Sequence, residues 1–135
     1  MPTMPPHFEL SLLPRRFALF RLAPTAPVPE WATQGPFSSI TRTGDELSIV
    51  CEQSLVPAEV QPQSSWRVLR VHGPFVPTET GVLSALAAPL AEARLSLFAI
   101  STFDTDYLLV APETISAAIT ALEQGGHKIH RSQEE

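Results

Sequence analysis

The uneven distribution of proline is the feature that most constrains how this chain can fold. Fourteen of the 135 residues are proline, about twice the usual share of roughly 5%. Twelve of them lie at or before Pro77. Because proline removes a backbone donor and fixes φ, the first half cannot hold long uninterrupted helices. We therefore expect strands, turns and short helical pieces there, and longer helices only in the second half.

Composition excludes several classes of protein. Hydrophobic residues make up 44% of the chain, enough to form a core. Charged residues make up only 17% and the net charge is -5, which argues against a nucleic-acid partner. One cysteine rules out a disulfide framework and a thiolate metal cluster. The sequence has neither a signal-peptide pattern nor an apolar run long enough to cross a bilayer, so we expect a cytoplasmic protein with no membrane partner.

Short apolar and alternating runs predict strands in the first half. They cover residues 8–13, 17–22, 37–43, 46–51 and 66–71. The first two runs are separated by Pro14-Arg15-Arg16 and are typical of a hairpin or of two consecutive edge strands. Gly44-Asp45 suits a two-residue hairpin turn. Cys51 falls on the apolar side of its strand, which favours a small buried hydrophobe over a nucleophile.

The second half adds two helices to its strands. Apolar residues from Leu83 to Ala91 recur at helical spacing, and Pro112 begins a second helical pattern that Gly125-Gly126 ends. Strands are expected at 95–103, 107–111 and 127–129. This order is that of the ferredoxin-like βαββαβ sandwich, an α+β fold. The first half reads as a degenerate copy, so we expect one unit over residues 8–64 and another over 65–130.

Two stretches of the second half resemble a known family. One runs from Thr80 through Pro89-Leu90-Ala91 to Phe98, and the other is Ser101-Thr102-Phe103-Asp104-Thr105-Asp106-Tyr107-Leu108-Leu109-Val110. Together they resemble the ACT domain, in particular the small tandem-ACT proteins related to the arginine sensors of animal cells. The resemblance implies a non-enzymatic regulatory or sensor protein that binds a free amino acid or similar small molecule at an interface between paired ACT units. A regulated enzyme or signalling protein is the implied partner. We also expect a homodimer, because the short helices of the first unit cover its sheet poorly and edge strands are left to be paired, and we expect no cofactor and no metal.

The same resemblance points to ligand-binding residues in three places. The loop from Gly73 to Thr80 and the helix start match the family's ligand loop. The start of the following strand presents backbone toward a ligand across a paired interface, and the next turn holds a basic side chain or an amino group. The residues so indicated are Val76, Glu79, Gly81, Ser96, Leu97, Thr102, Phe103 and Asp106. The loop departs from the arginine sensors at Val76-Pro77-Thr78, so the resemblance does not specify arginine.

Simple chemistry supports an amino acid as the ligand. Amides at the helix start near Gly81 are donors for a carboxylate, and glycine allows close approach to the backbone. Glu79, Asp104 and Asp106 supply acceptors for an ammonium group. Each has a structural alternative: Glu79 as an exposed helix-dipole residue, the aspartates as turn residues, and Gly81 as a packing residue.

Other interpretations stay open beside this one. Asp104 and Asp106 form an Asp-x-Asp pair that could hold a divalent metal in a small enzyme, although no third acidic ligand lies near in sequence. His127 and His130 could also ligate a metal, but they follow two glycines and favour a solvated pair. Trp31 fits a partner contact or a lid over the first unit. A structural interaction module without a ligand is the remaining alternative.

Overall fold

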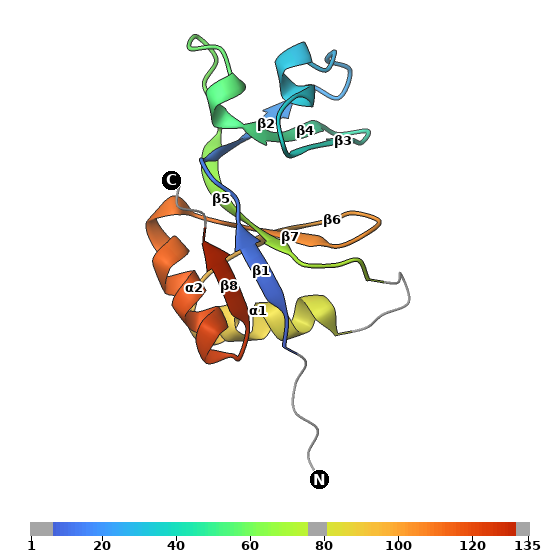
Figure 1. The fold of residues 1–135 in the computed structure, drawn as a ribbon. Coiled ribbons are helices and arrows are strands. Elements are labelled where there is room, and N and C mark those ends of the chain that lie inside the picture. The colour runs from blue at the N-terminus through green and yellow to red at the C-terminus, as the bar shows by residue number, and fades with distance from the viewer. Residues whose placement is uncertain (1–6, 76–80, 132–135) are drawn as a thin grey trace. The chain divides into compact units, whose positions relative to one another are not determined.

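The computed structural model describes residues 7–75 and 81–131, and the chain divides into two compact units (Figure 1). The smaller unit is Arg15–Trp66. The larger unit contains the described residues that precede and follow this segment.

The smaller unit is an antiparallel sheet whose connections contain 3-10 helices. Its elements are β2 (Phe17–Leu22), η1 (Glu30–Thr33), β3 (Ser38–Arg42), β4 (Leu47–Glu52), η2 (Gln53–Leu55) and the beginning of β5 (Ser64–Val71). The strand order β3-β4-β2-β5 is the order of a βαββαβ unit in which 3-10 turns stand in place of both helices. Prolines flank these turns, as expected from their effect on helices.

A small core holds this unit together. Its buried residues are Ala18, Phe20, Ala32, Leu47, Ile49 and Cys51. Trp31 is partly buried against this core, with its ring 5.3 Å from that of Phe20, so it covers the smaller unit as a lid would. Burial, with the neighbouring Glu52 carboxylate, raises the pKa of the Cys51 thiol to about 11. The thiol is therefore a packing group, as its position on the strand indicated.

The larger unit has five strands and two helices packed on one face. Its elements are β1 (Glu9–Leu12), the rest of β5, α1 (Val82–Glu92), β6 (Phe98–Ser101), β7 (Asp106–Val110), η3 (Pro112–Thr114), α2 (Ile115–Gln124) and β8 (Lys128–Arg131). The strand order is β8-β1-β5-β7-β6. Both helices lie on the same side of this sheet in Figure 1, and their buried residues join the inward-facing strand residues in one core. Such a face-to-face arrangement is that of a ferredoxin-like unit.

The position of β1 differs from the prediction. The run 8–13 was expected to pair with 17–22 or to lie beside it at a sheet edge, within a unit spanning 8–64. Instead β1 pairs antiparallel with β5 and parallel with β8, between the strands that are first and last in the βαββαβ order. Leu10 and Leu12 are buried there in the core beneath the helices. An alternating pattern specifies a strand with one buried face, but it does not specify the partner strand.

The division between units also falls inside a strand. Ser64–Trp66 pair with β2 of the smaller unit, whereas Arg67–Arg70 pair with β7 of the larger one. A boundary at 64/65 was expected, and the observed one lies two residues later. The α+β class and the tandem ferredoxin-like organisation are confirmed. No helix among the described residues combines the length and the apolar character that crossing a bilayer requires.

Candidate functional site

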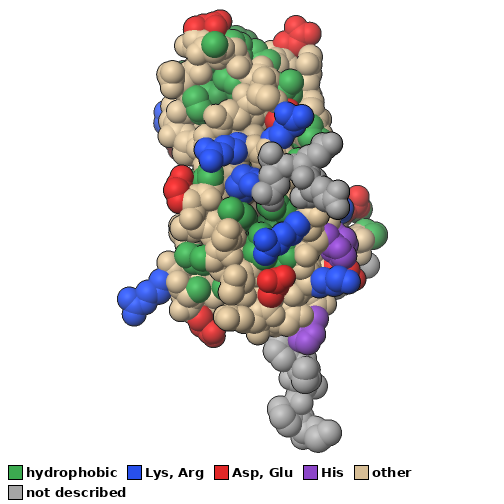
Figure 2. All heavy atoms as spheres, turned by 60° about the vertical axis from the view of Figure 1, so that its left-hand side comes forward, with side chains coloured by type: hydrophobic (Ala, Val, Ile, Leu, Met, Phe, Trp, Pro, Cys, Tyr) green, Lys and Arg blue, Asp and Glu red, His purple; other side chains and the backbone are tan. Residues whose placement is uncertain are grey.

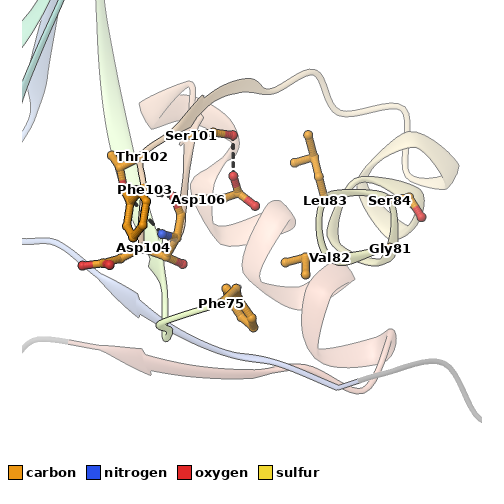
Figure 3. Close-up of a pocket in the computed structure, with 11 residues that line it drawn as sticks. Phe75, Gly81, Val82, Leu83, Ser84, Ser101, Thr102, Phe103, Asp104 and Asp106 are labelled. Carbon is orange, nitrogen blue, oxygen red and sulfur yellow. Dashed lines mark hydrogen bonds between the residues drawn. The ribbon is translucent and has the colours of Figure 1, made fainter. Parts of the chain in front are cut away.

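An open pocket lies in the larger unit between the start of α1 and the hairpin that joins β6 to β7 (Figure 3). Its volume is about 330 Å³, at the small end of the range typical of ligand sites. The residues that line it are Phe75, Gly81, Val82, Leu83, Ser84, Ser101, Thr102, Phe103, Asp104, Thr105 and Asp106. Apolar side chains from α1 and from Phe75, which follows β5, thus face the hairpin with its polar side chains.

The helix side of the pocket is made by Gly81 and the first turn of α1. Gly81 is the N-cap residue and has φ of +82°, a left-handed conformation that glycine adopts without strain. A Cβ built on Gly81 would meet no described atom within 4 Å, so open space, not packing, surrounds this residue. The first helical hydrogen bond runs from the Ala85 N–H to the Gly81 carbonyl at 3.0 Å. The N–H groups before Ala85 have no acceptor within the helix, and the helix dipole adds positive potential at this end.

The hairpin side carries a hydrogen-bonded pair of polar side chains. Ser101 and Asp106 are cross-strand partners in the β6–β7 ladder. The Ser101 hydroxyl donates to Oδ1 of Asp106. In Figure 3 the Asp106 side chain points from the hairpin toward the start of α1. Asp106 is half-buried and lines the pocket. One of its carboxylate oxygens already accepts the hydrogen bond from Ser101.

Contacts with the end of β5 hold the hairpin in place. The Phe75 N–H donates to the Asp104 carbonyl at 2.8 Å, and the Thr105 hydroxyl donates to the Val71 carbonyl at 2.7 Å. A Cβ built on Gly73 would lie 2.9 Å from the Asp104 carbonyl oxygen, closer than packed atoms approach. Glycine at 73 therefore lets the hairpin backbone sit directly against the chain that leaves β5.

The structure brings together four of the eight predicted ligand residues. Gly81, Thr102, Phe103 and Asp106 all line the pocket. Phe103 is 83% exposed and stands at the rim. Val76 and Glu79 lie outside the described residues.

Ser96 and Leu97 do not line this pocket. They precede β6, which begins at Phe98 and not at 95 as the apolar run suggested. The pocket is reached only at Ser101, the other end of that strand, about 10 Å further along. Leu97 instead packs against the core, and Ser96 is exposed.

Sequence reasoning missed several lining residues. The apolar ones are Phe75, Val82 and Leu83, and the polar ones are Ser84 and Ser101. Ser101 could have been found, because it begins the motif that ends in Asp106 and a short hairpin places those two positions opposite one another. Phe75 lies in the 73–80 loop that the resemblance indicated, but its backbone contact with the hairpin is what places it at the pocket.

The aspartates of the hairpin have different orientations. Asp104 points its carboxylate away from the start of α1, whereas Asp106 points toward it (Figure 3). The Asp104 main chain accepts the Phe75 N–H, which is the behaviour of a turn residue. The two carboxylates therefore do not converge on a shared ion in this structure, and the alternative of a metal-dependent enzyme gains no support from them.

His127 is not the solvated residue that the sequence indicated. It is 5% exposed. The Phe8 N–H donates to its Nδ1 at 3.1 Å, so Nε2 carries the proton and donates to the Ala85 carbonyl at 3.1 Å. His127 thus links β1, α1 and the segment before β8, whereas His130 lies on the open face of the sheet and contacts Glu9.

Charged side chains of both signs are interspersed on the face shown in Figure 2. Histidines lie beside acidic and basic groups in this view.

Two family models match the chain. The ACT domain model matches residues 61–124, and a model of an N-terminal domain matches residues 15–59. The two matches meet close to the boundary between the two compact units.

Similar proteins are known from animals and bacteria. The chain is 34% identical over 110 residues to the human cytosolic arginine sensor for mTORC1 subunit 1, covering 76% of this chain and 32% of the sensor. It therefore spans about a third of the length of the curated relatives it matches first. A crystal structure of an Agrobacterium tumefaciens protein has a TM-score of 0.86 at 35% identity and covers 96% of this chain and 97% of that one. A Vibrio cholerae protein of unknown function has a TM-score of 0.69 at 19% identity, covering 87% and 89% of the two chains, and shows the fold alone.

The fold and the matches define a class of protein, a tandem ferredoxin-like protein whose second unit has an open pocket beside a helix start. The chain belongs to the ACT-domain family and is related to the cytosolic arginine sensors. The resemblance seen in the sequence is confirmed.

Proposed function

We propose that this protein is a non-enzymatic amino-acid sensor or freestanding regulatory subunit that binds its ligand in the pocket between α1 and the β6–β7 hairpin. The observation that carries the proposal is the placement of Asp106, whose carboxylate faces the start of α1, where the first amides have no acceptor within the helix, across a pocket of amino-acid size. A free amino acid has one anionic and one cationic end. The pocket offers a complementary group to each.

The two ends of the ligand would be recognised by different chemistry. Among the residues that line the described pocket there is no Lys or Arg, so the ligand carboxylate depends on backbone N–H groups of the first turn of α1. The ligand ammonium would bond to Asp106 in a charge-assisted hydrogen bond. Phe75, Val82 and Leu83 would contact the ligand side chain.

The pocket is open on its own, so a second ACT unit is proposed to complete it. Ser96 and Leu97, which precede β6, would face the pocket of a neighbouring copy in a homodimer, as pairing in this family implies. Glu79 and Val76 would contribute from the loop before α1. Ligand binding would then stabilise the paired arrangement, and an enzyme or signalling protein in the cytoplasm would respond to that change.

A thermal-shift screen tests the proposal. The untagged full chain is heated with each proteinogenic amino acid. Arginine is the first probe, because a related protein is named as an arginine sensor. A ligand that binds only the folded protein raises Tm by mass action. We expect one amino acid, or a small chemically related group, to raise Tm in a concentration-dependent way. If none does at millimolar concentration, the alternative of a structural interaction module replaces the sensor.

Sedimentation tests the dimer separately. We expect a species of twice the 14.7 kDa chain mass, favoured by the amino acid that raises Tm. A monomer at high concentration with and without that amino acid would remove the homodimer from the account. The pocket within one chain would remain.

A further inference from the structure

Three potential metal ligands meet on the sheet face that the helices leave uncovered. Leu10 and Leu12 of β1 point into the helix-covered core, so the alternate residues Glu9 and Ser11 lie on the opposite face. Glu9 is joined there by His72, directly after β5, and by His130 of β8. One ligand atom from each of Glu9, His72 and His130 lies within 4.8 Å of the other two.

Backbone hydrogen bonds and strand register hold Glu9, His72 and His130 near one another. The His72 N–H donates to the Glu9 carbonyl at 2.8 Å, which extends the ladder between β1 and β5. In the parallel ladder on the other side of β1, Ser11 is the partner of His130. The three ligands therefore come from adjacent strands in a defined register, and little backbone ordering is needed on binding.

Side-chain contacts orient the rings. Nε2 of His130 lies 2.6 Å from Oε1 of Glu9, and the Ser11 hydroxyl lies 2.6 Å from Nε2 of His72. The two imidazole rings are stacked, with centroids 5.1 Å apart and planes inclined by 10°. A simple surface ion pair needs only Glu9 and His130. A second imidazole with a ligand atom within 4.8 Å of those of Glu9 and His130 makes this a group of three potential ligands.

The protonation states suit a cation as well. Partial burial, then the nearby Arg70 and His130, lowers the pKa of His72, which favours the neutral imidazole that binds metals. The hydrogen bond from His130 lowers the pKa of Glu9. Glu9 is exposed and both histidines are partly exposed, so an ion from solvent can reach them.

We propose that Glu9, His72 and His130 bind a divalent transition-metal ion of the Zn²⁺ type, with water in the remaining coordination position. Two imidazoles and a carboxylate are a donor set that such ions prefer. The ligands must be deprotonated to hold the ion, so binding releases protons and weakens as pH falls. It would also tie β1 to β5 and β8, and so fix the strand that sequence alone did not place in this unit. The residues that line the amino-acid pocket are not part of this group, so the inference does not rest on the proposed function.

Calorimetric titration with Zn²⁺ tests the site. The untagged full chain is stripped with a chelator and dialysed, then titrated with ZnCl₂. We expect micromolar or tighter affinity, a stoichiometry of one, proton release and a rise in Tm. Replacing any ligand should weaken Zn²⁺ binding by at least about tenfold, since even an outer-shell partner is worth that much. The variants are Glu9→Gln, His72→Gln and His130→Gln.

His7→Gln is the matched control. His7 is an exposed histidine of the same unit that stacks edge-on toward His127 and does not belong to the cluster. It should leave Zn²⁺ affinity unchanged. The proposal is overturned if wild type binds Zn²⁺ only in the millimolar range, or if the cluster variants and His7→Gln have equal affinity. If a histidine variant loses its folded far-UV spectrum, exposed Glu9→Gln decides alone.

Discussion

The two units of this chain share one topology and differ in what connects the strands. In the smaller unit the connections carry 3-10 turns of four and three residues, whereas in the larger unit they carry α-helices of 11 and 10 residues. Both sheets nevertheless follow the βαββαβ order, with β1 added to the larger one. Strand pairing alone therefore maintains the topology. Only a helical connection, however, places the start of an α-helix beside a hairpin. Only the larger unit has that combination among the described residues.

The largest effect is expected when a buried leucine is truncated in the core of each unit. Leu86 of α1 and Leu47 of β4 are both fully buried. Leu86→Ala and Leu47→Ala should each lower the free energy of unfolding by about 2–5 kcal/mol, measured by denaturant titration. Leu86→Ala should also weaken amino-acid binding, because α1 forms one wall of the pocket. If Leu47→Ala weakens binding as much while the protein is still folded, the smaller unit takes part in recognition and the contrast between the units fails.

A matched pair of glycine substitutions compares the two units at a smaller scale. Gly73→Ala places a Cβ 2.9 Å from the Asp104 carbonyl, which should cost about 1–3 kcal/mol and displace the hairpin that carries Asp106. Gly44→Ala, in the β3–β4 turn of the smaller unit, meets nothing within 4 Å. Its effect should stay within about 0.5 kcal/mol. Thermal unfolding and amino-acid titration of both variants check this expectation, and equal effects would show that the close approach at Gly73 does not hold the hairpin.

The smallest effect concerns the reactivity of the Cys51 thiol, which is buried in the smaller unit. With its pKa raised by burial from 9.0 to about 11, the Cys51 thiol has about a hundredfold smaller thiolate fraction at pH 8 than an ordinary thiol. Native protein should therefore react slowly with iodoacetamide and rapidly once denatured, as followed by mass spectrometry. Equally rapid modification of the native protein would mean that the sheet of this unit opens readily.

Most of the fold could be predicted from local patterns because those patterns reflect burial. The spacing from Leu83 to Ala91 gave α1, and Pro112 with Gly125-Gly126 bounded the second helical segment. The place of β1 could not be predicted, because Leu10 and Leu12 would satisfy the buried face of either unit. Long-range pairing decides between the two, and no local signal reports it.

The candidate site was predictable where residues lie in one motif and not where it is assembled by contacts. Thr102, Phe103 and Asp106 share a hairpin, so one motif located all three. Ser96 and Leu97 precede β6, whereas the pocket is reached only at the other end of that strand. Phe75 enters through its backbone bond to Asp104, a contact that depends on the tertiary fold.

The orientation of Asp106 toward the start of α1 is the central claim, and one titration tests it most directly. The amino acid that raises Tm is titrated calorimetrically into wild type, Asp106→Asn and the control Asp104→Asn. We expect Asp106→Asn to lose about 1.5–3 kcal/mol of binding free energy, which is about 10- to 150-fold in Kd, and we expect the Tm without ligand to stay almost unchanged. Asp104→Asn, whose carboxylate points away from α1, should bind as wild type does. Unchanged affinity in Asp106→Asn, or an equal loss in both variants, would contradict the account.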